Sequence, residues 1–252
     1  MPEPPAAADH ALARRAATEA GRLLVTLRAE LLHAGHDPRS MGDVGDRQAH
    51  LFLVDLLARE APDDAVLSEE GRDDLRRLDV ARVWIVDPVD GTREFSEAGR
   101  TDWAVHVALA IDGAAVAGAV ALPARDVTLG TDPAPPPRPA YDGEPRILVS
   151  RSRPPAQAHI IQEALGGHLV PMGSAGAKAM AVVLGEADVY AHAGGQYEWD
   201  NAAPAAVAAA AGLHVSRLDG SELRYNQADP WLPDLLICRP DLADPVLRAL
   251  AG

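Results

Sequence analysis

The stretch VWIVDPVDGTREF, residues 83–95, constrains the fold of this chain more than any other segment. Its first four residues are β-branched or aromatic, which is the composition of a buried strand. We expect this strand to end at Asp87, because Pro88 fixes its φ angle and makes the turn that follows stiff. Strand ends that suddenly become acidic and glycine-bearing are where α/β proteins tend to place their chemistry. The stretch therefore predicts an α/β fold with a functional site at this strand end.

Composition and charge narrow the classes of function. The chain has 252 residues, of which 48% are hydrophobic, enough for one large domain or two closely packed smaller ones. The formal net charge of −14 argues against a nucleic-acid groove or an anionic membrane surface, because polyanions bind basic surfaces. Acidic side chains can still bind a small anion if they first collect metal cations. We therefore expect a small-molecule partner, with no nucleic acid and no membrane.

Cysteine usage and the chain start bear on the compartment. Cys238 is the single cysteine, so no disulfide can form within the chain, and we expect a buried core thiol. The start, MPEPPAAADHALARR, holds no apolar signal core, and no run of about 18 apolar residues occurs. These features predict a soluble, cytoplasmic protein.

The first part of the chain, residues 1–140, is expected to form an α+β lobe. Apolar residues at spacings of three, four and seven predict a long amphipathic helix at its start. A polar segment, HAGHDPRSMGDVGDRQ, follows this helix and includes the loop GDVGDRQ. Asp112 and Gly113 form a strong hairpin-turn signal between two apolar runs. The expected elements are helices at 8–33 and 48–59 and strands at 83–86, 103–111 and 115–122.

The second part, residues 141–252, is expected to form an α/β lobe. The proline-dense segment DPAPPPRPAYDGEP reads as a connection between subdomains, since it suits neither a helix nor an interior strand. After it, strands and helices alternate, which is typical of α/β architecture. The expected elements are strands at 146–150, 168–172 and 187–192 and a close-packed, alanine-rich helix at 201–211.

The acidic end of the first strand suggests a cation site. Asp87 and Asp90, three residues apart in a turn, can face the same side with the carbonyl of Val89 between them. Oxygen ligands of this kind suit a hard cation such as magnesium. Gly91 and Thr92 are expected to open a short helix, whose free N–H groups suit a phosphate oxygen. The alternative is an Asx-type turn with solvated acids, and this motif alone leaves both open.

Two further acidic motifs lie far from this strand. Glu69 and Glu70 follow a short apolar run, and they are either a solvated surface pair or part of the site if the fold returns them to Asp87. Asp200 is expected where a Gly-Gly loop ends and the alanine-rich helix begins. It is either an N-cap, a common position for aspartate, or a further ligand.

Taken together, Glu69, Asp87, Asp90 and Asp200 resemble, in order and context, the inositol monophosphatase-like superfamily of magnesium-dependent phosphatases. The motif D-P-[IVL]-D-G-T-x-[EN]-F is present in full as residues 87–95, and Trp-Asp precedes the alanine-rich helix. The resemblance spans nearly the whole chain. It implies a two-lobed, layered αβαβα sugar-phosphatase fold with catalytic metals between the lobes.

Finer features look like the bacterial CysQ branch, the 3′-phosphoadenosine 5′-phosphate (PAP) phosphatases of sulfate assimilation. Glu94 stands where enzymes acting on inositol phosphates typically have asparagine, and Ala193 where they carry a glutamate for the inositol hydroxyls. The segments ILVSRSRPP, MGSAGAKAM and AGGQYEWD look like the same branch. Two departures are Ser68, in place of the usual glycine, and the missing Val-Thr before Asp46. The implied reaction is magnesium-dependent removal of the 3′-phosphate of PAP, giving AMP.

The resemblance also implies roles for individual residues. Two or three magnesium ions per site would activate water for an in-line displacement with no covalent intermediate, and lithium would inhibit by occupying the second metal position. Thr92, hydrogen-bonded to Asp46, would orient and deprotonate the water, with Glu70 as a helper. The implied ligands are Glu69, Asp87 and the Val89 carbonyl for the first metal, and Asp87, Asp90 and Asp200 for the second.

Other residues are expected to contact the substrate. Ser150, Arg151 and Ser152 offer hydroxyls and a guanidinium suited to a second phosphate, the alternative being a solvated turn before Pro154. Lys178 is either a phosphate contact or a surface charge. The remaining expected contacts are Gly91, Thr92, Asp200 and the turn of Gly173, Ser174 and Ala175. Histidines 106, 168 and 192 are expected to be satisfied core or edge residues, because their spacing fits no metal motif.

Two other functions stay open at this point. One is a broad inositol-1-phosphate or sugar-phosphate monophosphatase with the same metal chemistry. The other is a non-catalytic factor that binds transcription machinery, as some superfamily members do. The sequence does not determine the oligomeric state, and a homodimer is the assembly we consider.

Overall fold

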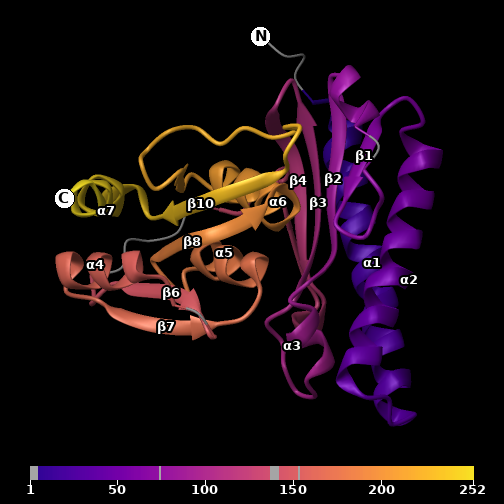
Figure 1. Cartoon of the computed structure of the whole chain (residues 1–252), viewed down its shortest axis with the longest axis horizontal. Helices are drawn as coiled ribbons and strands as arrows, with labels where there is room; N and C mark the ends of the chain where they lie inside the picture. Colours follow the sequence, from indigo (N-terminus) through magenta and orange to yellow (C-terminus); the bar gives the residue numbers. More distant parts are fainter. Residues whose placement is uncertain (1–4, 74, 137–141, 153) are drawn as a thin grey trace.

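The computed structural model describes residues 5–73, 75–136, 142–152 and 154–252, and it contains two five-stranded sheets (Figure 1). The expected boundary between lobes, at residues 140 and 141, lies outside the described residues, so the division into 1–140 and 141–252 stays a prediction. The elements are α1 (Ala7–His33), α2 (Pro38–Glu60), β1 (Ala65–Ser68), η1 (Arg76–Asp79), β2 (Arg82–Asp90), α3 (Thr92–Ser96), β3 (Ala104–Ile111), β4 (Ala114–Leu122), η2 (Pro123–Arg125), β5 (Val127–Gly130), β6 (Arg146–Ser150), α4 (Ala156–Leu165), β7 (His168–Met172), α5 (Ala175–Leu184), β8 (Val189–Tyr197), α6 (Glu198–Ala210), β9 (His214–Ser216), β10 (Trp231–Cys238) and α7 (Pro240–Ala251).

The first sheet has the strand order β1-β2-β3-β4-β5, and only β1 and β2 pair in parallel. β3 and β4 form the expected hairpin. Its turn residues Asp112 and Gly113 have φ values of 49° and 81°, the left-handed conformation that a two-residue turn of this type requires. The apolar sides of α1 and α2 pack on the outer face of this sheet. The helix expected at 8–33 is confirmed to within one residue.

The second sheet has the order β7-β6-β8-β10-β9, with β6 parallel to both of its neighbours. The strands expected at 146–150 and 168–172 are confirmed with the same bounds. Helices α4 and α7 contact each other and cover the outer face of the sheet. They lie on the side of the molecule opposite α1 and α2 (Figure 1).

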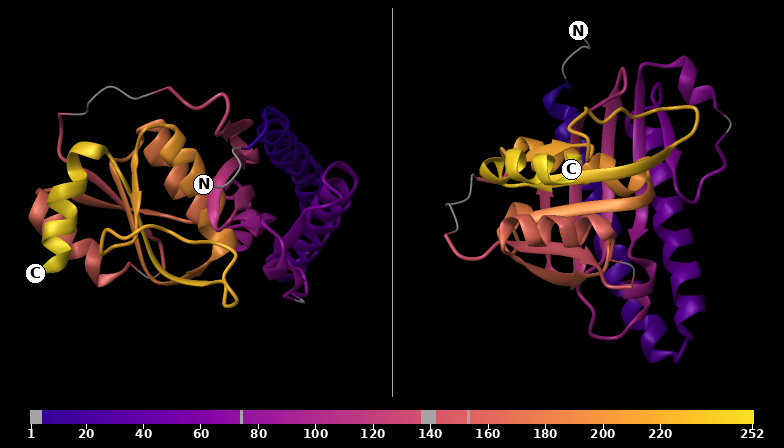
Figure 2. Two further views of the ribbon diagram at one scale, coloured as in Figure 1. Left: turned by 90° about the horizontal axis from the view of Figure 1, so that it is seen from above. Right: turned by 60° about the vertical axis from the view of Figure 1, so that its left-hand side comes forward.

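Helices α5 and α6 lie between the two sheets, as both views in Figure 2 show. Their small side chains allow close approach: a Cβ placed on Gly118 of β4 would lie 3.4 Å from the Cα of Ala203 in α6. Most of α5 and α6 is buried in the largest hydrophobic cluster. The five layers are therefore α1/α2, sheet, α5/α6, sheet and α4/α7, which is the αβαβα arrangement expected from the resemblance.

The expected start of the second helix, residue 48, is wrong. α2 begins at Pro38, where Asp37 is the N-cap and accepts the N–H groups of Arg39 and Ser40 at 3.1 Å each. The glycines of this segment suggested a loop, but they allow close helix packing. A Cβ on Gly42 would lie 2.6 Å from Cγ2 of Thr92. Asp46 is therefore on a helix, not in a loop.

The Gly-Gly loop expected before Asp200 is also wrong. β8 continues past residue 192 to Tyr197, and Gly194 and Gly195 lie inside it with φ values of 110° and 91°. The two glycines form an irregularity in the ladder, and β10 pairs with β8 on either side of them, at Ala193 and Gln196. As a result, α6 begins at Glu198, and Asp200 is the third residue of the helix.

Two expectations about the chain as a whole have structural counterparts. Cys238 is fully buried at the end of β10, as expected of a core thiol, and burial raises its pKa to about 12. Within the described ranges, none of the helices combines the length and apolar character needed to cross a membrane.

Candidate active site

Asp87 and Asp90 are buried at the end of β2. One carboxylate oxygen from each of Asp87, Asp90 and Asp200 lies within 4.8 Å of those from the other two. A regular strand would send residues three apart to opposite faces. However, Asp87 pairs with His106 and Asp90 with Ala104, so three steps on β2 match two steps on β3. This bulge turns both carboxylates toward the same point.

The turn expected after Asp87 is thus a bulge within a longer strand. Pro88 is tolerated there because a bulge does not require its missing N–H. The N–H of Val89 donates to Oδ1 of Asp87 at 3.1 Å, so an Asx-type bond is present as well. Asp87 is only 1% exposed, which rules out a solvated acid. The two interpretations of the motif are therefore not exclusive.

Asp90 is surrounded by donors from the start of α5. It accepts the N–H groups of Ala175 at 3.0 Å and Gly176 at 2.6 Å, and the hydroxyl of Ser174. Burial by itself would raise the pKa of Asp90, but the charge of His106 and these hydrogen bonds lower it to about 2. Asp90 is therefore ionised and fixed to the N-terminus of α5.

The other carboxylates of the site repel one another. Burial, followed by the charges of Glu69, Asp90 and Asp200, raises the pKa of Asp87 well above its usual value. Glu69 is exposed as a residue, yet desolvation of its carboxyl group raises its pKa to about 7, with the charges of Asp200, Glu70 and Asp90 adding to the effect. Such a cluster is stabilised by a cation that neutralises it.

Asp200 is not the N-cap of α6, which is Tyr197, but the third residue of the helix. Its Oδ2 accepts the N–H of Tyr197 at 2.7 Å, which closes the start of α6. Its carboxylate is also part of the cluster with Asp87 and Asp90. Burial and the charge of Asp90 raise the pKa of Asp200 to about 6.

Thr92 and Asp46 are brought together from α3 and α2. The Thr92 hydroxyl lies 3.3 Å from Oδ1 of Asp46 and 3.1 Å from the carbonyl oxygen of Val89. A hydroxyl has one proton, so it donates to one of these acceptors at a time. Burial, with the charges of Glu70 and Glu69, raises the pKa of Asp46 to about 7. The pair expected from the resemblance is therefore in contact.

His106 is a residue of the site that the sequence reading missed. It is fully buried, its Nδ1 donates to the carbonyl of Trp199 at 2.9 Å, and its Nε2 lies 3.2 Å from Oδ2 of Asp90. Burial opposes its charge, but Asp90 raises its pKa overall. A Cβ on Gly176 would lie 2.0 Å from Nε2, so this helix start needs glycine. Its position in the strand expected at 103–111 was the only available signal.

The turn of Gly173, Ser174 and Ala175 contacts Asp90, and Lys178 lies behind it. Lys178 is 5% exposed, and its Nζ donates to the carbonyls of Gly173 at 3.3 Å and Ser174 at 2.5 Å. Burial lowers the pKa of Lys178. The interpretation of Lys178 as a surface charge is therefore wrong, because the ammonium group is enclosed and holds this turn.

Arg151 is engaged at the end of β6. Its Nη2 donates to Glu94 at 2.7 Å and its Nη1 to Glu97 at 3.1 Å, both on or next to α3. Ser150 ends β6, and Ser152 is exposed just beyond it. These ion pairs join the second sheet to α3. Glu94, which stands where enzymes acting on inositol phosphates typically have asparagine, therefore has Arg151 as its partner.

Glu70 and its neighbours lie at the end of β1. Glu70 is exposed, and its charge helps to raise the pKa of Asp46. Ser68, which replaces the usual glycine, bonds its hydroxyl to Nδ1 of His50 in α2 at 2.8 Å. This contact ties the strand end that carries Glu69 to α2.

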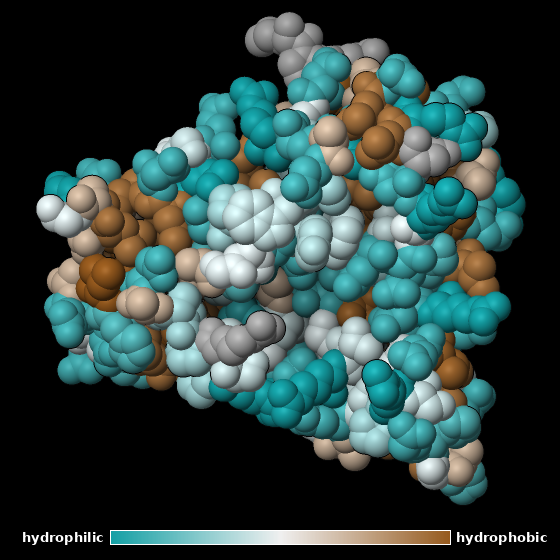
Figure 3. All heavy atoms as spheres, viewed as in Figure 1, coloured by the Kyte–Doolittle hydropathy of each residue, from teal (hydrophilic) through white to brown (hydrophobic). Residues whose placement is uncertain are grey.

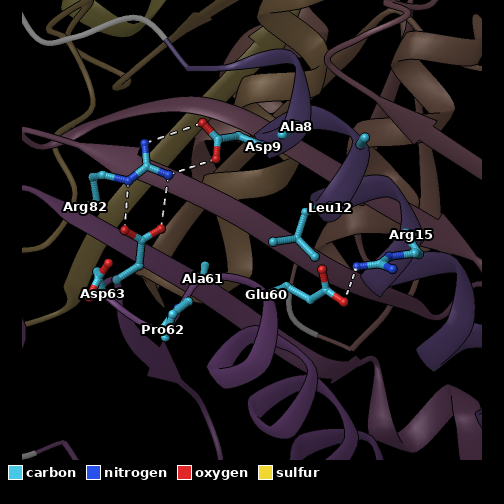
Figure 4. Close-up of a pocket in the computed structure, with 11 residues that line it drawn as sticks. Ala8, Asp9, Leu12, Arg15, Glu60, Ala61, Pro62, Asp63 and Arg82 are labelled. Carbon is cyan, nitrogen blue, oxygen red and sulfur yellow. Dashed lines mark hydrogen bonds and ion pairs between the residues drawn. The ribbon is translucent and has the colours of Figure 1, made fainter.

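The pocket in Figure 4, about 560 Å³ in volume, lies at the opposite end of β2 from these acids. Arg82 donates there to Asp64 at 2.8 Å and to Asp9 at 2.8 Å, and Arg15 pairs with Glu60 at 3.0 Å. Its arginines are thus already paired with carboxylates, and none of the sequence-predicted site residues lines it.

Sequence comparison identifies related proteins. The inositol monophosphatase family model matches residues 6–132 and 143–245. A protein of Mycobacterium bovis named 3′-phosphoadenosine 5′-phosphate phosphatase is 54% identical over 247 residues, covering 92% of this chain and 90% of that protein. The 3′(2′),5′-bisphosphate nucleotidase CysQ of Escherichia coli K12 is 32% identical over 219 residues, covering 79% and 84%.

Structural comparison agrees with the sequence matches. CysQ from Bacteroides thetaiotaomicron, described as a bacterial member of the inositol monophosphatase family, superposes with a TM-score of 0.75. It is 27% identical, and the match covers 91% of this chain and 96% of that one. The expected phosphatase fold is therefore confirmed.

Proposed function

The chain belongs to the inositol monophosphatase family, and we propose that it removes the 3′-phosphate from PAP to give AMP and phosphate. The convergence of Asp87, Asp90 and Asp200 at one bulged strand end is the observation that carries the hydrolytic part. The 54% identity to a protein named for PAP hydrolysis supports the substrate. A role in sulfate assimilation follows from the same likeness.

Magnesium fits the donor set. Asp87, at the end of β2, and Asp200, at the start of α6, have raised pKa values because they are buried beside other carboxylates, so a divalent cation would relieve this repulsion. We assign Glu69, Asp87 and the Val89 carbonyl to one ion and Asp87, Asp90 and Asp200 to a second. Magnesium bound there would lower the pKa of a bound water and neutralise the leaving oxygen.

The surrounding residues hold groups and move protons. Asp46, with a pKa raised to about 7, can accept a proton that Thr92 relays from the attacking water, and we assign Glu70 the role of a helper. The N–H groups of Gly91 and Thr92, at the start of α3, would bind the phosphate oxygens. Ser174 and Lys178 fix the turn that receives Asp90, so we assign them, with Gly173, to the shape of the site.

The second phosphate of PAP needs a cation outside the metal cluster. Arg151 has five N–H donors, of which three are used on Glu94 and Glu97. We propose that the 5′-phosphate displaces Glu97, the more exposed carboxylate, and is held by Arg151 with the hydroxyls of Ser150 and Ser152. Inositol 1-phosphate has no second phosphate and gains nothing from this contact.

Phosphate release from a substrate panel tests the proposal. PAP, its sulfated derivative PAPS, inositol 1-phosphate and fructose 1,6-bisphosphate are compared with magnesium and with a chelator, with and without lithium. We expect the highest kcat/KM on PAP, no release without magnesium, and inhibition by lithium at limiting magnesium. Similar values across the panel would favour a broad monophosphatase instead.

Absence of release from every substrate would favour the non-catalytic alternative, which a pull-down with Asp87→Asn would then separate from catalysis.

We also propose a cytoplasmic location, which a buried single Cys238 supports, and a homodimer, which a mass measurement in solution tests.

A further inference from the structure

Aromatic side chains in this protein are mostly buried, with two exceptions next to the active site. Among the described residues, Tyr197 and Trp231 are the aromatic ones with large exposed side chains, at 45% and 49% exposure. Trp84, Trp103 and Phe95, in contrast, are fully buried. Exposed Tyr and Trp are costly to leave in water and are typical of binding surfaces.

The two exposed aromatics lie directly opposite each other on neighbouring strands. Tyr197 ends β8 and Trp231 begins β10, and the two are partners in the antiparallel register. Opposed residues of such a pair project from the same face of a sheet. The indole of Trp231 also lies over Gly195, where a Cβ would come within 2.6 Å of its Nε1. The glycine of the GGQYEWD segment therefore makes room for the indole.

This aromatic pair is held firmly. One face of the Tyr197 ring stacks on Trp199, with centroids 4.8 Å apart and an interplanar angle of 8°. Glu198, fully buried, accepts the N–H groups of Asn226 at 2.6 Å and Gln227 at 2.7 Å, which fastens the segment before Trp231 to the start of α6. A rigid aromatic surface loses little entropy when a planar ligand stacks on it.

The pair is also adjacent to the acidic cluster. The N–H of Tyr197 donates to Asp200, whose carboxylate converges with Asp87 and Asp90. On the face shown in Figure 3, pale spheres of intermediate hydropathy gather near the centre of the molecule, over β8 and β10. A substrate bound at the cluster by one end can therefore reach these rings with its other end.

We propose that Tyr197 and Trp231 bind the purine base of the substrate by stacking. The inference rests on the proposed hydrolysis of PAP and assigns the part of the site that reads the base. A base is uncharged, so stacking is not opposed by the net charge of −14, which disfavours each additional anion. Ala193, on the same strand, offers no carboxylate for sugar hydroxyls, which is consistent with an aromatic rather than a polar recognition surface.

Trp231→Ala tests the inference with two substrates that share both phosphates. One is PAP, and the other is a ribose 3,5-bisphosphate that lacks the base. Loss of one aromatic partner in base stacking is expected to lower kcat/KM for PAP by about 5- to 100-fold, mainly through KM, and to leave the base-free substrate unchanged. Trp231→Phe should retain most of the PAP activity. Ile160→Ala, at an exposed residue of α4, is the matched control.

Two results would overturn the inference while leaving the proposed function intact. The wild-type protein would hydrolyse the base-free bisphosphate as efficiently as PAP, or Trp231→Ala would lower both substrates equally. If the wild-type protein does not hydrolyse PAP at all, the proposed function is wrong and this inference falls with it.

Discussion

Two buried acidic sites of this protein differ in what balances their charge. Asp188, just before β8, is 1% exposed and accepts the N–H and Nε of Arg146 at 2.9 Å each, with Arg239 at 3.4 Å. Burial opposes its ionisation, but the bonds from Arg146 lower its pKa overall. Asp87 is equally buried, and although Nδ1 of His106 lies 4.0 Å from its Oδ2, burial and the charges of three other carboxylates raise its pKa.

The difference separates a structural acid from a functional one. A buried carboxylate with arginine partners is complete within the fold, and removing it leaves positive charge unpaired. A buried carboxylate among other carboxylates carries a repulsion that persists until a cation binds, so the fold maintains a site that is useful only with a ligand. Asp90 falls between these cases, because it belongs to the cluster and is also fully hydrogen-bonded.

The largest effect is expected on turnover. Asp87→Asn and Asp90→Asn should each lower kcat by roughly three orders of magnitude or more, since hydrolysis of a phosphate monoester needs large charge stabilisation. Asp188→Asn, at the residue just before β8, is the matched control and should keep normal kcat. Steady-state phosphate release with PAP checks all three. Near-normal activity in Asp87→Asn would remove the metal assignment.

Substitutions at these acidic residues should have different effects on the stability of the fold. Without magnesium, Asp87→Asn should leave the melting temperature level or raised, because it relieves repulsion. Asp90→Asn should lower it, because His106 and the α5 start lose their ionised partner. Asp188→Ala should cost about 3 kcal/mol of unfolding free energy, since it leaves Arg146 and Arg239 without their buried carboxylate. Urea unfolding of the metal-free proteins measures this, and equal losses at Asp87 and Asp188 would contradict the comparison.

A smaller effect is expected from pH. Asp46 and Glu69 have pKa values raised to about 7 and Asp200 to about 6, so the folded state holds more protons than the unfolded one. The stabilisation that these carboxyl groups give the metal-free protein is therefore fully present below about pH 4, near their pKa values in the unfolded chain. It is lost as the pH rises to about 7. Asp90 acts oppositely, but only as pH falls toward 2.

Magnesium should reverse that loss. At a concentration 100 times its Kd, magnesium stabilises the folded state by about 2.7 kcal/mol through mass action. Melting curves between pH 5 and 8, with and without magnesium, should therefore diverge toward higher pH. If the melting temperatures with and without magnesium differ by the same amount at every pH, magnesium binding is not linked to the protonation of the cluster.

The smallest expected effect concerns Arg151. Arg151→Ala should lower kcat/KM for PAP about tenfold and change it little for inositol 1-phosphate, because only PAP carries a second phosphate. Glu97→Gln should lower the KM for PAP, since it weakens the carboxylate that competes for the guanidinium. An equal loss of kcat/KM on both substrates would mean that Arg151, like Arg146, has only a structural role as the ion-pair partner of carboxylates.

Elements with strong local patterns could be predicted from the sequence, and elements shaped by packing could not. α1 and the strands at 146–150 and 168–172 follow from periodicity and composition. The start of α2 was missed because Gly42 and Gly45 are characteristic of loops locally, yet here they admit Thr92 and Phe95. β8 was predicted too short for a similar reason, since the strand continues past its two glycines and pairs with β10 again at Gln196 and Tyr197.

The site divides in the same way. The sequence by itself determined which acids are present and in what order, and the motif of residues 87–95 with Trp-Asp was enough to indicate the family. It also determined that this acidic chain would need cations to hold a phosphate. These are properties of residue type and local spacing.

The tertiary structure alone decided the charge state and orientation of those acids. The bulge that aligns Asp87 with Asp90 exists because β2 pairs with β3 out of step. Asp90 is ionised because of the charge and hydrogen bond of His106 on β3, followed by the hydrogen bond of Ser174, 84 residues later at the start of α5. His106 and Arg151 likewise acquired their roles from partners distant in sequence. Burial and long-range hydrogen bonds set these pKa values and directions, and neither is encoded in the spacing of nearby residues.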